Sequence, residues 1–230
     1  MNSLQHSAQV EDYSSANTPM HQPAVTRFFA HFFSYLFHPL FIPLYVTYYL
    51  AFINPGYFNG FTNTEKIRVL LSVAIDIVFL PAVSVLLLRG VGFINSIFLK
   101  TQKERILPYI ISNIFFFWMY LVFRNQSAIP PILTSFVFSV FLSSSVALLA
   151  NIYFKISMHA IGVGGLLGFM LIILFTNTFY SATLPFAIAL LISGVVCTSR
   201  MIVSNHTQKD IYLGLLFGIP CQVVGAYIIL

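Results

Sequence analysis

Long apolar runs separated by short polar segments make up most of the chain after residue 35. Seven runs are apparent, at about 36–53, 67–88, 109–123, 132–150, 160–176, 183–198 and 211–230. Several approach or exceed the roughly 18 apolar residues that suggest a helix crossing a bilayer. The runs are continuous and do not alternate, which excludes a transmembrane β-barrel. The pattern therefore predicts an all-α, polytopic membrane helical bundle with six to seven transmembrane helices.

The N-terminal end of the chain has a different character. Residues 1–26 are rich in Ser, Gln, Asn and Thr and lack an apolar stretch behind a basic start, so we expect a polar tail and no cleaved secretory signal. The aromatic segment 27–35 is typical of the membrane interface and leads into the first run. The predicted domains are a polar N-terminal tail, 1–30, and a transmembrane domain, 31–230.

Composition supports a membrane protein and excludes one class of partner. The chain is 58% hydrophobic and 7% charged, whereas soluble domains are about 45–50% apolar and about 25% charged. The net charge of +5 comes from basic residues scattered singly in loops, so no nucleic-acid partner is expected. Within the run 160–176, Ala160, Gly164 and Gly168 are spaced four apart, which favours close approach of a second helix in the membrane.

A polar segment near the C-terminus carries four kinds of chemical group, on Ser199, Arg200, His206 and Asp210. On a helix, His206 and Asp210 would share a face, so the carboxylate could orient an imidazole that acts as a nucleophile or general base. Arg200 can bind a phosphate through its planar fork of donors, and Ser199 adds a hydroxyl. The same segment also fits a helix start with an interfacial arginine, because Thr207-x-x-Asp210 resembles a capping box.

Two further polar segments are candidates for the same site. Ser157 and His159 offer a hydroxyl and a possible general acid, although Ser157 also suits a helix N-cap. Lys100 and Arg105 offer two cations for a phosphate, although they also fit a solvated charged loop. Two apolar runs separate each polar segment from the next, which places all three on one side of the membrane if the run 109–123 crosses fully.

The order of these segments resembles the type 2 phosphatidic acid phosphatase (PAP2) superfamily. Ser199-Arg200-x5-His206-x3-Asp210 matches the third signature of that superfamily at every defined position. Ile156-Ser157-Met158-His159 resembles the second signature, Pro-Ser-Gly-His, and Lys100 to Pro108 resembles the first, Lys-x6-Arg-Pro. The resemblance covers about residues 95–215. It implies a divergent, bacterial-type member with a PAP2-like core in the domain 31–230, a location in the bacterial inner membrane, and no metal or other cofactor.

The resemblance also implies a role for each candidate residue. His206 would be the nucleophile that forms a phosphohistidine, Asp210 would orient it, and His159 would protonate the leaving group. The phosphate would be held by Arg200, Ser199, Ser157, Arg105 and Lys100. The implied function is metal-independent hydrolysis of a lipid phosphomonoester or a lipid or polyprenyl diphosphate, with the lipid bilayer as the environment of the substrate.

Two other hypotheses stay open. Ile156 and Met158 stand where the second signature has Pro and Gly, so the chain could be a catalytically inactive relative that binds or moves anionic lipids. Asp76 is a lone carboxylate within an apolar run, which makes it a functional candidate by default and the possible centre of an ion-coupled transporter.

Basic residues predict the side of the membrane on which the site lies. With seven crossings, eight basic residues share the side of the signature segments, and three lie on the other side, namely Lys66, Arg68 and Arg124. The excess of positive charge predicts a site that faces the cytoplasm. Bacterial relatives that recycle lipid diphosphates usually face outward, so the two expectations differ.

Overall fold

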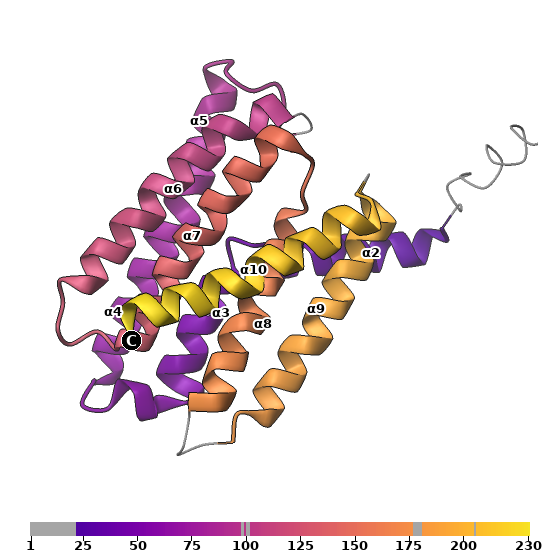
Figure 1. Ribbon diagram of the computed structural model, residues 1–230. Coiled ribbons are helices and arrows are strands. Elements are labelled where there is room, and N and C mark those ends of the chain that lie inside the picture. The colour runs from indigo at the N-terminus through magenta and orange to yellow at the C-terminus, as the bar shows by residue number, and fades with distance from the viewer. Residues whose placement is uncertain (1–21, 98, 100–101, 177–180, 205) are drawn as a thin grey trace, which may run out of the picture.

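The computed structural model of the protein describes residues 22–97, 99, 102–176, 181–204 and 206–230 (Figure 1). This part of the chain is helical and contains no β-strand. Six helices in it are long and apolar enough to cross a membrane. Their bounds are Asn63–Gly90, Gln102–Arg124, Pro131–Tyr153, Met158–Thr176, Thr183–Val203 and Gln208–Ile229. The prediction of an all-α, multi-pass membrane bundle is confirmed.

The apolar run predicted at 36–53 is not one continuous helix. Helix α2 (Ala24–Leu36) ends where that run begins, and the chain turns before α3 (Ile42–Tyr48), which continues as the π-helical segment η2 (Tyr49–Ile53). At about 1.5 Å per residue, α3 and η2 together span roughly 18 Å, less than the ~30 Å hydrocarbon core. Two prolines explain the break, because Pro39 lies in the turn and Pro43 in the first turn of α3.

Helix α2 also corrects the predicted boundary of the N-terminal tail. The helix begins at Ala24, inside the segment 1–30 that the sequence predicts as polar tail, whereas residues 1–21 lie outside the described residues. Its aromatic side chains recur at helical spacing and stay exposed, including Phe28 and Phe32. An amphipathic helix of this kind is typical of the interface of a bilayer. Further along the chain, the short 3-10 helix η3 (Pro55–Phe58) follows η2.

The first long helix consists of α4 (Asn63–Val73), the π-helical segment η4 (Ala74–Phe79) and α5 (Leu80–Gly90). Pro81 lacks the backbone N–H that an α-helix would use at this point, and the wider π turn before it accommodates the missing bond. Asp76 lies on this π segment and is partly buried. Among the described residues it has no hydrogen-bond or ion-pair partner, so its role stays a prediction.

Helices α6 (Gln102–Arg124) and α7 (Pro131–Tyr153) pack against each other and contribute to the main apolar core. Helix α6 is longer than the predicted run 109–123, because its first two turns include Arg105 and Pro108, which the sequence placed in a charged loop. With 23 residues, α6 reaches roughly 34 Å and is long enough for a full crossing. A full crossing by α6 is the condition under which the three polar segments share one side, and its length allows that crossing.

Helices α8 (Met158–Thr176) and α10 (Gln208–Ile229) form the closest crossing in the bundle. A Cβ atom added to Gly218 would lie 2.4 Å from the carbonyl oxygen of Ile161, and one added to Gly168 would lie 2.8 Å from that of Ile219. Gly164 and Ala160 line the same crossing from α8. The predicted small-residue face is therefore confirmed, and α10 is the helix that packs on it.

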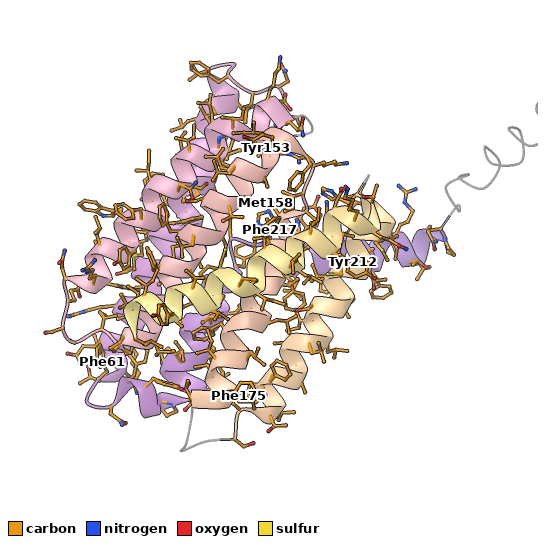
Figure 2. All side chains as sticks on the ribbon, in the orientation of Figure 1. Phe61, Tyr153, Met158, Phe175, Tyr212 and Phe217 are labelled. Carbon is orange, nitrogen blue, oxygen red and sulfur yellow. The ribbon has the colours of Figure 1, made fainter. Side chains whose placement is uncertain are left out.

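The outer surface of the bundle is apolar. Tyr153, Phe175 and Tyr212 are 82%, 80% and 67% exposed, respectively (Figure 2). A second, smaller core cluster lies where α10 passes over the start of α8, and Met158 and Phe217 pack against it (Figure 2). Large exposed apolar side chains on every long helix are expected where the solvent is lipid. Helix α9 (Thr183–Val203) lies against α8 on one side and α2 on the other (Figure 1).

Candidate functional site

The loop between α9 and α10 and the first turn of α10 hold the imidazole and the carboxylate that are predicted to act together. Nδ1 of His206 lies 3.4 Å from Oδ2 of Asp210, and these side chains are only 8% and 14% exposed. His206 precedes the helix, so the two residues do not share a helix face as the sequence predicted. Thr207 is the N-cap of α10 and forms a full capping box with Asp210, whose Oδ2 accepts from the Thr207 N–H at 3.0 Å. The capping box holds the Asp210 carboxylate beside His206. The same carboxylate can therefore cap α10 and orient the imidazole.

The last turn of α9 supplies Arg200 and Ser199. Nε of Arg200 is buried and has no hydrogen-bond partner among the described residues. The hydroxyl of Ser199 is different, because it is buried and donates to the Val195 carbonyl in its own helix at 2.7 Å. A buried guanidinium without a partner is costly unless an anion pairs with it. Arg200 is therefore the group in this loop region best suited to bind a phosphate.

The start of α8 is fixed directly to the start of α10. The backbone N–H of Ser157 donates to the carbonyl of Asp210 at 3.2 Å. Ser157 is fully buried, and its hydroxyl accepts from the N–H of Ala160 at 3.4 Å, as expected of an N-cap. These bonds bring the second and third signature segments together. The Ser157 hydroxyl therefore acts as an acceptor towards its own helix, and this bond does not use its O–H proton.

His159 meets a second imidazole from the turn after α2. Its Nε2–H donates to the carbonyl of Ser34 at 3.1 Å, which leaves Nδ1 as the other ring nitrogen. The ring of His38 packs edge-on against it, with centroids 5.2 Å apart and planes at 84°. Nδ1 of His38 accepts from the N–H of Leu40 at 3.3 Å. His38 was not among the predicted site residues, and its contact with His159 adds it to the site.

Electrostatic interactions connect the remaining parts of the site. The charge of Arg200 acts on all three imidazoles, those of His38, His159 and His206. Arg105, in the first turns of α6, also interacts electrostatically with Arg200, while its Nε donates to the Leu99 carbonyl at 2.8 Å. The structure thus brings Arg105 towards the other candidates. Lys100, the other cation of the first segment, lies outside the described residues.

Burial and charge keep two of the imidazoles neutral. Burial and the charges of Lys155 and Arg200 lower the pKa of His206 to about 4, although the contact with Asp210 acts in the opposite direction. Burial, with a smaller contribution from Arg200, lowers the pKa of His38 to about 4. At pH 7 both rings are therefore uncharged. A neutral His206 carries the lone pair that a nucleophile or base requires.

Thermal stability is expected to fall as the pH is lowered from 7 towards 4. His38 and His206 ionise near pH 6.5 when unfolded but at about 4 when folded. Between these values the unfolded chain binds more protons, so acidification lowers the free energy of unfolding. Melting temperatures of the purified protein at pH 7 and pH 5 would measure the effect. The decrease should be smaller in the double variant His38→Gln/His206→Gln, and an equal decrease in both proteins would contradict the assignment.

Two residues of the site were missed from the sequence for different reasons. His38 is separated by more than a hundred residues from His159, so no spacing connects them. Lys155 lies in the polar break just before Ser157, and its position next to a signature segment could have predicted that it lies near the site. Asp76 takes part in none of the interactions described for Arg200 and the histidines.

The assembled groups are suited to binding and transforming an anion. Nε of the Arg200 guanidinium has no hydrogen-bond partner among the described residues, its charge acts on three imidazoles, and one of these imidazoles contacts a carboxylate. The described residues contain no group of three or more His, Cys, Asp or Glu side chains that could hold a metal ion. Comparison of the chain with models of known protein families, with curated proteins and with solved structures finds no match.

Proposed function

We propose that the protein is an integral-membrane lipid phosphatase of the PAP2 type, which hydrolyses a lipid phosphomonoester or diphosphate without a metal. The observation that carries the proposal is the buried, unpartnered Nε of Arg200 beside the imidazoles of His159 and His206. A phosphate bound by Arg200 would satisfy the guanidinium and lie next to a neutral imidazole. His159 comes from the second PAP2-like signature, and Arg200 and His206 come from the third.

The chemistry follows from which ring nitrogens are engaged. Because Nδ1 of His206 faces Asp210, Nε2 carries the free lone pair and attacks phosphorus. An N–P bond forms, the P–O bond to the leaving group breaks, and Arg200 stabilises the charge on the equatorial oxygens. Once the bound phosphate offsets the charge of Arg200, His159 takes a second proton from water at Nδ1 and donates it to the leaving oxygen, while Nε2–H stays on the Ser34 carbonyl.

The second half of the reaction restores the site. Water attacks the phosphohistidine and gives a proton to Nδ1 of His159, which is now neutral. The N–P bond breaks, its electron pair returns to Nε2 of His206, and inorganic phosphate leaves. The net change is hydrolysis of one phosphate bond by one water molecule. His38 would act as a positioning residue, because it packs on the ring of His159 and no step requires it to exchange a proton.

The engaged serine hydroxyls favour one alternative, a catalytically inactive protein that binds anionic lipid. Ser199 and Ser157 are predicted phosphate ligands, yet both are buried. The Ser199 hydroxyl donates its proton to the Val195 carbonyl, and the Ser157 hydroxyl accepts from the Ala160 N–H. In this alternative Arg200 binds a lipid phosphate that is not cleaved. Both functions predict lipid binding, so turnover is the property that separates them.

The test is phosphate release from phosphatidate by the purified protein in detergent micelles containing EDTA. We expect metal-independent release, inhibition by vanadate, and an acid-labile phosphoenzyme after rapid quenching with radiolabelled substrate. Binding of phosphatidate with no release and no phosphoenzyme would establish the inactive alternative. In oriented vesicles, release from added lipid by inside-out vesicles alone would place the site at the cytoplasmic face, and release by right-side-out vesicles alone would exclude that placement.

Capping of α10 and orientation of His206 can be separated by mutation. Thr207→Ala removes the hydroxyl that accepts from the Asp210 N–H, and it should cost about 1 kcal/mol of stability while leaving most of the phosphatase activity. Asp210→Ala removes both the cap and the contact with His206, so activity should fall at least about 100-fold as well. Phosphate release and chemical denaturation of both variants would measure this. Equal activity losses in the two would show that Asp210 acts only through the cap.

A further inference from the structure

An apolar groove lies between α2 and α9, outside the polar site. It is an open groove with a volume of about 830 Å³, which is within the range of roughly 300–1,000 Å³ typical of ligand sites. Its walls include Phe29 and Phe33 from α2 and Leu190, Leu191 and Gly194 from α9. Leu191, in the wall of the groove, is 68% exposed. In a membrane protein such a groove opens towards lipid.

One end of the groove is continuous with the site. Ser199 lines the groove, and the next residue is Arg200 with its unpartnered Nε. The opposite wall, α2, extends to Ser34, whose carbonyl accepts from His159. Both walls of the groove therefore end at residues of the site. A ligand in this groove would have an apolar part between the helices and an anionic part at the guanidinium.

The length of the groove fits a hydrocarbon chain. On α9 its lining extends from Ala187 to Ile202, which at about 1.5 Å per residue is roughly 22 Å. One leaflet of the hydrocarbon core is about half of ~30 Å. The groove is therefore longer than the depth of one leaflet, so a lipid chain that starts at the polar end has room to lie in it. A soluble phosphate ester would leave these apolar walls uncovered.

We propose that the groove between α2 and α9 binds a hydrocarbon chain of the lipid whose phosphate is bound at Arg200. The position of the lipid headgroup at Arg200 rests on the proposed function. The groove adds a second determinant of which substrate the protein prefers. Lipids with long chains are preferred over short-chain or soluble phosphate esters because only long chains cover the groove. Helix α2, which precedes the six long helices, supplies one wall and thereby sets this preference.

Gly194 allows the groove to be filled without disturbing the fold. A Cβ atom added to Gly194 meets nothing within 4 Å, and the residue lines the groove. Gly194→Phe would place a ring in the space proposed for the lipid chain. Gly90, at the end of α5, also has nothing within 4 Å of an added Cβ and does not line the groove, so Gly90→Phe is the matched control.

Kinetics with two phosphatidates provide the first test. For dioleoyl phosphatidate, we expect Gly194→Phe to raise KM at least about 10-fold, the effect of keeping a few methylene groups out of an apolar site. For dihexanoyl phosphatidate, KM and kcat should stay close to those of the parent. Gly90→Phe should change neither substrate. An unchanged KM for dioleoyl phosphatidate in Gly194→Phe would overturn the proposed groove, as would an equal rise for both substrates.

Photocrosslinking tests the groove independently of catalysis. A phosphatidate with a diazirine near the end of its acyl chain should label peptides of α2 and α9 in the parent and in Gly90→Phe, and this labelling should be lost in Gly194→Phe. Labelling of this kind without phosphate release would support the groove and refute the phosphatase. Labelling spread evenly over all helices, as for lipid that merely surrounds the protein, would overturn the groove. Chemical crosslinks placing a second copy of the chain there would overturn it too.

Discussion

Replacing His206 by alanine is expected to reduce phosphate release from phosphatidate by at least about 1,000-fold. The imidazole is the only proposed nucleophile, its Nδ1 contacts Asp210, and its pKa is lowered to about 4 by burial and nearby positive charge. Without it no phosphoenzyme can form. Initial rates and radiolabelled phosphoenzyme in the parent and the variant would measure both effects. Binding of phosphatidate should be largely kept, because Arg200 is unchanged.

An exposed histidine of α2 serves as the control for this experiment. His31 lies on the exposed face of α2 and stacks on Tyr35, with ring centroids 6.3 Å apart. His31→Ala should release phosphate at the parental rate. If His206→Ala were as active as His31→Ala, the assignment of the nucleophile would be wrong. If the parent itself bound phosphatidate but released no phosphate, the binding function would replace the phosphatase.

The helices were predictable from the sequence because lipid imposes a simple rule. A segment that crosses the bilayer must be apolar over its length and must satisfy its own backbone bonds, so long apolar runs become helices. The rule is weaker at the ends of helices. Helix α6 begins at Gln102, although residues 102–105 are polar, because a helix can extend beyond the apolar core. The prediction of one helix over 36–53 was wrong for a different reason, because Pro39 and Pro43 interrupt the helix.

Part of the site was predictable from the sequence. Contacts between residues far apart along the chain were harder to predict than contacts between near neighbours. His206 and Asp210 are four residues apart, so a contact between them could be expected from spacing. The direct bond between Ser157 and Asp210 follows the predicted convergence of two segments on one side of the membrane, although only the structure identifies the atoms. The contact of His38 with His159 depends on how α2 packs on α9, and no local pattern encodes that packing.

The small residues of α8 and α10 connect the fold to the site. The close crossing at Gly218 brings the start of α8 against the start of α10, where Ser157 donates to Asp210. Any change that separates the helices would also move His159 relative to His206, which lie on either side of this bond. Catalytic groups misplaced by about 1 Å can lose roughly 100-fold in rate. A substitution far from the polar residues should therefore affect both stability and activity.

Gly218→Ala is expected to be strongly destabilising for this reason. The added methyl would lie 2.4 Å from the Ile161 carbonyl oxygen and 2.8 Å from the Gly165 nitrogen. Both are backbone atoms, so the two helices must move apart, and overpacking of this kind costs about 1–3 kcal/mol. We expect a lower melting temperature in detergent and, at a temperature where the variant is folded, phosphate release reduced at least about 10-fold.

The matched control is Gly194→Ala, which makes the same change in the middle of α9. An added Cβ there meets nothing within 4 Å, so alanine should only reduce the freedom of the unfolded chain and improve the helix. The melting temperature should stay the same or rise slightly. If both alanine variants melted at the parental temperature, α8 and α10 would pack less closely than the 2.4 Å between an added Gly218 Cβ and the Ile161 carbonyl oxygen implies. If Gly218→Ala melted lower but kept full activity, the packing of α8 on α10 would stabilise the fold without positioning His159 and His206.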